Sequence, residues 1–468
     1  MDRIDRARVA LSRALGDAVV RTDPDFLREM SRDESDVDGV IAAAVVSPRT
    51  AGEVSRALAL CDAHEVPVFP RGGGTGRTGG SVPVEAGVVL DTRGLAGLVE
   101  VDRENLLALV GPGMTTEAFQ NAVAREGLFF PPDPQSAPWS CLGGNVAENA
   151  GGPRAFKYGV TRDWTLGMDV ALMGGEVLRV GRRTAKGVTG YDLTSTLVGS
   201  EGTLGVFTSL TLRLMVRPPC LRAVVARFSD VLHAGDAVAR IVAAGARPRC
   251  VELLDDVCCD VLRAGAPEAL PEGVGAVLMF EADGDSDAEV DGCVARVGEA
   301  CVAAGASDVS RASEPAAMEA LWSVRRVMSR TLRTRARHKL SEDVVVPRAS
   351  VPALLRAVRG ISAARGLVMP TYGHAGDGNL HVNVLWDDDA QRPAVDAAVA
   401  DLMRATLALG GTLTGEHGVG LSKRDYLAWE QSEGLIALQR RVKSAFDPKG
   451  LLNPGKIFAP AATGHRGC

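Results

Sequence analysis

The chain has 468 residues, of which 46% are hydrophobic and 24% charged, a composition typical of a soluble globular protein with two or three domains. A formal net charge of −6 argues against a nucleic-acid partner, which needs a basic face. The N-terminus lacks the apolar core of a secretory signal, and no apolar run approaches the roughly 18–20 residues of a membrane-spanning helix. We expect a cytoplasmic protein with no transmembrane segment, and peripheral association with the inner face of the membrane stays open.

The first half of the chain alternates helices with short apolar strands. Helices are expected over 1–36, 50–64 and 115–127. Strands are expected at 45–48, 66–70, 87–91, 98–101, 106–110, 164–173, 177–180 and 204–215. Nine scattered cysteines without a Cys-x-x-Cys pair predict reduced thiols rather than a disulfide framework.

A glycine-rich segment follows the strand at 66–70. It has six glycines between positions 72 and 80, and such a run lets backbone N–H groups converge on an anion. Residues 74–79 formally match G-x-G-x-x-G, the Rossmann dinucleotide fingerprint. That interpretation fails because only six residues separate Gly80 from Gly87, too few for the helix that the fingerprint must open. A diphosphate cradle is favoured over a glycine-rich turn without a ligand. Two further clusters of glycine and polar residues lie at 141–159 and 199–206.

A boundary is marked by Pro218-Pro219. Beyond it, 222–228, 231–245 and 248–254 have the pattern strand, helix, strand, and 275–282, 286–304 and 306–311 repeat it. Two such β-α-β units predict a ferredoxin-like sheet covered by helices on one face. Helices are then expected at 315–335, 349–364, 389–408 and 433–445, with strands at 344–346 and 366–371.

Three of the seven histidines lie in two glycine-rich segments, 371–383 and 411–420. His374 and His381 would stand about 23 Å apart in an extended chain, but Gly376-Asp377-Gly378 predicts a reversal that brings them together. Glu416 and His417 follow in the second segment. Two imidazoles and a carboxylate suit Zn, Mn or Fe, and a third imidazole suits a proton acceptor. Isolated structural histidines are the alternative.

Together the glycine and histidine segments resemble FAD-linked 2-hydroxyacid dehydrogenases. The stretch from Pro132 to Val160 is especially similar to the branch of the glycolate oxidase flavoprotein subunit and D-lactate dehydrogenase, within the vanillyl-alcohol oxidase / p-cresol methylhydroxylase (PCMH) superfamily. The resemblance implies an α+β fold. It has a PCMH-type FAD-binding domain of two α/β subdomains (1–217) and a ferredoxin-like α+β substrate and metal-binding cap domain (218–432). A C-terminal segment (433–468) returns to the FAD domain.

The resemblance also implies non-covalent FAD, because the first loop lacks the histidine or cysteine that attaches the flavin in some relatives. The first loop would hold the pyrophosphate, 143–152 would lie along the flavin, and 199–206 would meet the adenosine half. The expected FAD-binding residues are Pro70, Arg71, Gly72, Gly73, Gly74, Thr75, Gly76, Gly79, Gly80, Ser81, Pro132, Gly143, Gly144, Asn145, Asn149, Gly151, Gly152, Tyr158, Gly159, Glu201, Gly202, Gly205, Val206 and Asn453.

For the chemistry, the resemblance implies His374, His381 and Glu416 as metal ligands and His417 as the base. Arg325 would bind the substrate carboxylate. The alternative is that Arg325 belongs to a solvent-exposed basic face without a ligand. Lys339 is a weaker candidate for binding the carboxylate. The implied reaction oxidises D-lactate or glycolate to the 2-oxo acid. The metal lowers the pKa of the hydroxyl, His417 takes its proton, and a hydride passes to flavin N5.

Electrons would then pass to a separate acceptor, namely an iron–sulfur subunit, an electron-transfer flavoprotein or quinone. Two alternatives stay open. One is a D-2-hydroxyglutarate dehydrogenase, which needs a second carboxylate anchor. The other is a non-catalytic flavoprotein electron-transfer subunit, which needs no metal site.

Overall fold

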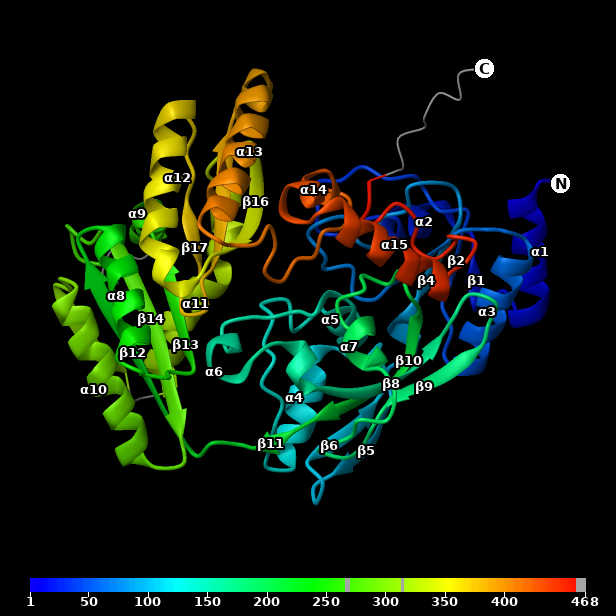
Figure 1. Ribbon diagram of the computed structural model, residues 1–468, viewed down its shortest axis with the longest axis horizontal. Coiled ribbons are helices and arrows are strands. Elements are labelled where there is room, and N and C mark those ends of the chain that lie inside the picture. The colour runs from blue at the N-terminus through cyan, green and yellow to red at the C-terminus, as the bar shows by residue number, and fades with distance from the viewer. Residues whose placement is uncertain (266–269, 313–314, 460–468) are drawn as a thin grey trace.

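The computed structural model describes residues 1–265, 270–312 and 315–459. Three smaller sheets, of four, five and two strands, and one large sheet of seven strands lie in separate halves of the molecule, side by side (Figure 1). Within the described residues no helix is long and apolar enough to cross a bilayer. The eight cysteines of these residues are all free thiols, as expected.

The first sheet has four strands in the order β1-β2-β4-β3. The strands are β1 (Val20–Arg21), β2 (Ala44–Val46), β3 (Val68–Arg71) and β4 (Val88–Asp91). The helices beside them are α1 (Arg3–Leu15), α2 (Pro24–Met30) and α3 (Ala51–Ala63). A capping box of Thr50 and Glu53 starts α3, which buries Val54, Ala57 and Leu58. The stretch 1–36 is thus not wholly helical, because β1 interrupts it to pair with β2.

The parallel strands β3 and β4 are joined by the glycine segment, and the connection contains no helix. Parallel neighbours are usually joined by a helical crossover. The rejection of a Rossmann site is therefore confirmed by the structure.

The second sheet is antiparallel, with the order β5-β6-β10-β8-β9. Its strands are β5 (Leu98–Asp102), β6 (Leu107–Val110), β8 (Thr165–Ala171), β9 (Val177–Gly181) and β10 (Val206–Arg213). The helix α4 (Thr116–Arg125) packs Phe119 edge-to-face on Phe130, with ring centroids 5.1 Å apart. The remaining elements are β7 (Leu128–Phe129), β11 (Met215–Val216), α5 (Leu142–Glu148), α6 (Ala155–Tyr158) and α7 (Leu193–Leu197). These short elements were not predicted.

The third sheet has seven strands in the order β15-β12-β14-β13-β17-β18-β16. Two β-α-β units supply its first four strands, in the ferredoxin-like order that the sequence predicts. They are β12 (Cys220–Phe228), α8 (Val231–Ala243) and β13 (Cys250–Leu254), then β14 (Ala276–Gly284), α10 (Asp287–Ala303) and β15 (Asp308–Ala312).

Helices cover both faces of this sheet, so the expected single covered face is wrong. One face packs against α8, α10, α12 (Val351–Arg365) and α13 (Arg392–Ala408). The other face packs against α9 (Asp256–Gly265) and α11 (Pro315–Arg333), through Cys258, Met328 and Leu332 among others. Both faces of the strands are therefore apolar over much of their length.

Three further strands extend the sheet: β16 (His338–Val345), β17 (Thr371–His374) and β18 (Asn379–Trp386). The strand expected at 366–371 is wrong, because the strand begins where the prediction ended. Gly366 adopts the left-handed conformation that caps α12, and Pro370 has no N–H for a ladder bond. His374 thereby lies inside a strand rather than after one. Short 3-10 turns are η1 (Thr92–Gly94), η2 (Thr161–Trp164), η4 (Arg348–Ser350), η5 (Asp389–Gln391) and η6 (Arg424–Tyr426).

The C-terminal helices α14 (Leu427–Glu430) and α15 (Glu433–Phe446) lie on the side of the N-terminal sheets (Figure 1). After them Leu452 forms a parallel bridge with Val68, and the backbone N–H of Asn453 donates to the Val68 carbonyl at 2.7 Å. The Asn453 amide also donates to the carbonyls of Gly80 (2.9 Å) and Glu201 (2.7 Å). The tail thus joins two of the three glycine segments.

Candidate functional site

The β17–β18 hairpin brings the two histidines of the first segment together, as the sequence predicts. Tyr372 of β17 lies opposite His381 of β18, and His381 lies opposite Asp343 of β16. His374 is two residues from Tyr372 and therefore points to the same face of the sheet. Neighbouring β13 is in register so that Glu252 lies beside His374. Four strands thus place these side chains on the sheet face that α11 covers.

Glu416, in the loop after α13, completes a compact donor set. Its Oε1 lies 3.5 Å from His374 Nε2 and 3.6 Å from His381 Nε2. One ligand atom from each of the three residues lies within 4.8 Å of the others. His374 and His381 are only 4% and 5% exposed. Two imidazole nitrogens and one carboxylate oxygen in a buried site fit Zn, Mn or Fe. The three expected ligands are therefore the ones that the structure brings together.

Glu252 orients His374. The carboxylate oxygen Oε1 lies 2.5 Å from His374 Nδ1, and Oε2 accepts from Arg325 Nε at 2.7 Å. Burial acts to raise the pKa of Glu252, but His374 and Arg325 outweigh it and lower the pKa to about 2. An ionised Glu252 holds a proton on His374 Nδ1, so Nε2 would be the nitrogen that ligates a metal together with Glu416. Sequence reasoning missed Glu252, although an acidic residue in an apolar strand was the signal.

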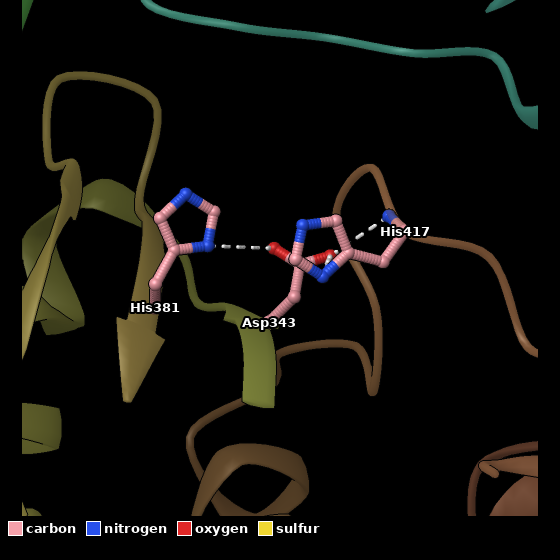
Figure 2. Close-up of side chains that lie close together, drawn as sticks. All are labelled: Asp343, His381 and His417. Atoms are coloured by element: carbon pink, nitrogen blue, oxygen red, sulfur yellow. Dashed lines mark hydrogen bonds and ion pairs between the residues drawn. The ribbon is translucent and has the colours of Figure 1, made fainter. Parts of the chain in front are cut away.

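Asp343, His381 and His417 form a second close group (Figure 2). The Asp343 carboxylate lies 3.6 Å from His381 Nδ1 and 4.0 Å from His417 Nδ1, and the two rings stack with centroids 5.4 Å apart. Asp343 already accepts hydrogen bonds from Asn379 and from the loop at 414–417. Among the described residues the Glu416 carboxylate faces only imidazoles, so it is the better ligand.

His417 has the properties of a proton acceptor. Burial lowers its pKa, against the opposing charges of Asp343 and Glu416. The imidazole is therefore neutral near neutral pH, which a general base requires. Its backbone carbonyl accepts from Thr78 Oγ1 of the glycine segment at 3.0 Å, so the second histidine segment touches the first glycine segment.

One cationic side chain, Arg325, lies beside the histidines, and a second, Lys339, lies four residues along β16 from Asp343. Arg325, 3% exposed, has its guanidinium carbon 4.8 Å from the Tyr372 ring centroid, and its buried Nη2 has no hydrogen-bond partner among the described residues. Lys339 donates to Ser329 Oγ at 2.9 Å. Burial, followed by the charges of Arg77 and Arg333, lowers the pKa of Lys339 to about 7. A buried, unpaired guanidinium nitrogen suits a carboxylate ligand.

The glycine segment fits an anionic cofactor group. Within the described residues the backbone N–H groups from Gly73 to Gly80 donate no hydrogen bond. Unpaired amides in a partly buried loop require a partner, and a diphosphate supplies several acceptors. A Cβ at Gly72 would lie 3.3 Å from Cys141 Cβ and 3.9 Å from Gly144 N. The first two glycine clusters are thus adjacent, as a shared cofactor site requires.

Other expected cofactor residues have contacts of their own. Glu201 accepts the backbone N–H groups of Val419 (2.8 Å) and Gly420 (2.7 Å), which joins the third cluster to the histidine loop. The Tyr158 hydroxyl donates to Asp283 Oδ2 at 2.8 Å, toward the large sheet. A Cβ at Gly205 would lie 2.3 Å from Val170 Cγ2, so close packing alone explains why a glycine stands at this position. Their roles toward a cofactor stay predictions.

Comparisons with known proteins agree with this geometry. The profile of the family "FAD linked oxidases, C-terminal domain" matches residues 217–457, and that of the "FAD binding domain" matches 42–181. The chain is 40% identical to glycolate oxidase subunit GlcD of Bacillus subtilis, over 90% of this chain and 89% of the relative. It is 36% identical to a D-lactate dehydrogenase of Archaeoglobus fulgidus, over 88% and 90%.

Among solved structures, p-cresol methylhydroxylase with substrate bound is similar with a TM-score of 0.79 and 18% identity, over 98% of this chain and 97% of that chain. A 4-ethylphenol oxidase from Gulosibacter chungangensis has a TM-score of 0.77 and 20% identity, over 98% of each chain. At such identities the likeness shows the fold, which is the PCMH-type arrangement that the sequence implies.

Proposed function

This chain belongs to the FAD-linked oxidases, and from that membership we propose that it is a dehydrogenase of a small 2-hydroxycarboxylate. D-lactate and glycolate are the favoured substrates, because relatives named for their oxidation share 32–40% of their residues with this chain. The observation that carries the proposal is the meeting of His374, His381 and Glu416 beside Arg325, whose Nη2 is buried without a partner.

Each residue has a role in this proposal. Arg325 binds the substrate carboxylate, with Lys339 as a second cation beside it. His417 accepts the hydroxyl proton, because its ring is neutral and stacks on that of His381. His374, His381 and Glu416 would hold a divalent metal, which would supply Lewis-acid polarisation of the hydroxyl, and bound FAD would supply the acceptor for the hydride from Cα.

We assign non-covalent FAD to the region where the glycine clusters meet. The unpaired amides of 73–80 and the open backbone at Gly144 support this placement. The division into 1–217, 218–432 and 433–468 and the transfer of electrons to a separate acceptor belong to the same proposal. The tail hydrogen bonds of Asn453 support the last segment of that division.

Anaerobic mixing of the purified, metal-loaded flavoprotein with substrate tests the function. D-lactate or glycolate should bleach the visible flavin band, and removal of the metal with a chelator should abolish bleaching. L-lactate is the stereochemical control for D-lactate. A protein that binds FAD and metal but is bleached by no 2-hydroxyacid would contradict the proposal.

The same assay with His417→Ala tests the base. FAD and metal should stay bound, and the rate of flavin reduction should fall by about 10²–10⁴-fold, which is the contribution of a general base. A normal rate of bleaching in this variant would remove His417 from the role.

D-2-hydroxyglutarate belongs in the assay as the second candidate substrate. It needs a further carboxylate anchor, and Arg77 lies near enough to Lys339 for its charge to lower the pKa of that amine. Bleaching at lower concentration by D-2-hydroxyglutarate than by D-lactate would favour this alternative. A non-catalytic electron-transfer subunit is disfavoured, because it has no need of the buried donor set.

A further inference from the structure

Asp343 is the centre of the hydrogen bonds that shape the histidine loop. It is fully buried on β16, and its two oxygens have different partners. Oδ1 accepts from the Asn379 side-chain amide at 2.6 Å. Oδ2 accepts from the Thr414 hydroxyl (3.2 Å) and from three successive backbone N–H groups, those of Gly415 (2.8 Å), Glu416 (2.8 Å) and His417 (3.0 Å). Successive amides that converge on one oxygen form an anion-binding nest.

The same carboxylate faces two imidazoles. His381 Nδ1 is 3.6 Å from Oδ1, and His417 Nδ1 is 4.0 Å from Oδ2 (Figure 2). His381 Nδ1 is buried and has no other acceptor among the described residues. Both ring nitrogens of His381 face a carboxylate, so the metal would decide between them: Nε2 would give its lone pair to the ion shared with Glu416, and the proton would stay on Nδ1 beside Asp343. In His381 that Nε2 faces Glu416 Oε1 at 3.6 Å.

We propose that Asp343 is a positioning residue that fixes the metal ligand His381 and the base His417 in the same tautomer. By holding the backbone at 415–417 it also places the Glu416 carboxylate. One buried aspartate thereby serves both metal binding and proton abstraction. The roles of His381 as metal ligand and His417 as base rest on the proposed function. The hydrogen bonds and distances around Asp343 do not depend on it.

Asp343→Asn tests the inference in the full-length flavoprotein, with Zn²⁺ as the probe. The asparagine oxygen can still accept the loop amides, but its NH₂ replaces Oδ1 and opposes both the Asn379 amide and the His381 Nδ1–H. His381 must then turn or change tautomer. We expect FAD to stay bound and Zn²⁺ affinity to fall by about 10–100-fold, the usual effect of losing a residue that orients a metal ligand.

At saturating Zn²⁺ the variant should show a kcat lowered at least about tenfold, with KM for the hydroxyacid nearly unchanged, because the base is mispositioned while the anchors are intact. Thr414→Val is the matched control. It removes one hydrogen bond to Oδ2 but keeps the carboxylate, so its losses of Zn²⁺ affinity and kcat should be clearly smaller than those of Asp343→Asn. Equal losses in the two variants would mean that Asp343 only anchors the loop, which would overturn the inference.

Tautomers measured in the wild-type protein keep the test independent of whether the variant folds. Nitrogen-15 spectra of the Zn²⁺-loaded protein with labelled histidine should show His381 and His417 with the proton on Nδ1. A proton on Nε2 of either ring would overturn the inference. Failure of the proposed function would be seen separately, as a wild-type protein that binds Zn²⁺ but is not bleached.

Discussion

Lys339 is an amine whose charge in the folded protein depends on pH near neutrality. Burial and neighbouring cations lower its pKa to about 7. Substrate carboxylate favours the protonated amine, and above the pKa the protonated fraction falls about tenfold per pH unit. We therefore expect kcat/KM for flavin reduction by D-lactate to decline as pH rises above about 7. On the acid side it should decline as His417 becomes protonated, below the ordinary pKa of an imidazole.

Lys339→Arg should remove the alkaline decline, because a guanidinium stays charged across this range. Lys186→Arg, at an exposed position, is the control and should keep the wild-type profile. If the wild-type kcat/KM does not change between neutral and alkaline pH, the proposed role of Lys339 in substrate binding is contradicted.

The meeting of His374, His381, Glu416 and His417, for which we propose the roles of ligands and base, could be predicted from the sequence, because glycines and a short hairpin place them in recognisable segments. The carboxylates that contact these histidines, those of Glu252 and Asp343, could not be predicted from the sequence. Glu252 lies 122 positions before His374, and only the register of β13 against β17 brings them together. Asp343 likewise depends on the pairing of β16 with β18. Strand register is set by the whole sheet, and local pattern does not reveal it.

At the scale of elements, the helix α5 tests where the flavin lies. A Cβ at Gly144 would meet no atom within 4 Å, and the same holds for Gly360 in α12. Alanine at either position should stabilise the cofactor-free protein slightly, because glycine in a helix costs about 0.5–1 kcal/mol relative to alanine.

Only Gly144→Ala should impair the flavin site. The added methyl group would occupy space that we assign to FAD, so FAD affinity should fall roughly tenfold or more, which corresponds to about 1.4 kcal/mol. Gly360→Ala should bind FAD like wild type in the same titration. If both variants bind FAD equally well, the cofactor does not lie over this turn of α5.

Most elements could be predicted from periodicity, including the two β-α-β units and the helices α3, α8, α10, α12, α13 and α15. The errors fall where local signals compete. Because of Gly366 and Pro370, β17 begins at Thr371, where the predicted strand ended. The helices α5 to α7 are too short to show a helical period in the sequence. Helices on both faces of the large sheet depend on tertiary packing, which binary pattern does not specify.

At the scale of the whole molecule, Asp283 joins the two halves. Its side chain, on β14, is 1% exposed and accepts from Lys157 Nζ (2.7 Å) and from the Tyr158 hydroxyl (2.8 Å) of α6. Arg249 Nη1 lies 3.5 Å from the same Oδ2 that accepts from Tyr158. Asp283→Ala would remove this carboxylate from all three groups, while Lys157 would keep the backbone carbonyl of residue 283 and Arg249 its pair with Glu281. We expect the free energy of unfolding to fall by about 1–3 kcal/mol, the cost of leaving the buried Tyr158 hydroxyl and part of the cationic charge without a partner.

Asp287→Ala is the matched control on the same half. Its carboxylate pairs with Arg222 but is 68% exposed, so its removal should cost less than about 1 kcal/mol. Urea denaturation followed by circular dichroism compares the two variants. Equal midpoints would show that the Asp283 contacts add nothing to the attachment of the large sheet.

The hydrogen bonds of Thr78 bear on how product leaves the enzyme. Its hydroxyl donates to the His417 carbonyl, and its own carbonyl accepts from Leu421 at 2.7 Å. Glu201 also accepts from Val419 and Gly420, so the loop that carries His417, the base in our proposal, is bonded to two loops of the N-terminal half. A rigid-body swing of the large sheet would have to break all of these bonds. We therefore expect exit of the oxo acid through brief rotamer and loop fluctuations, on a nanosecond to microsecond scale, rather than through slow domain separation.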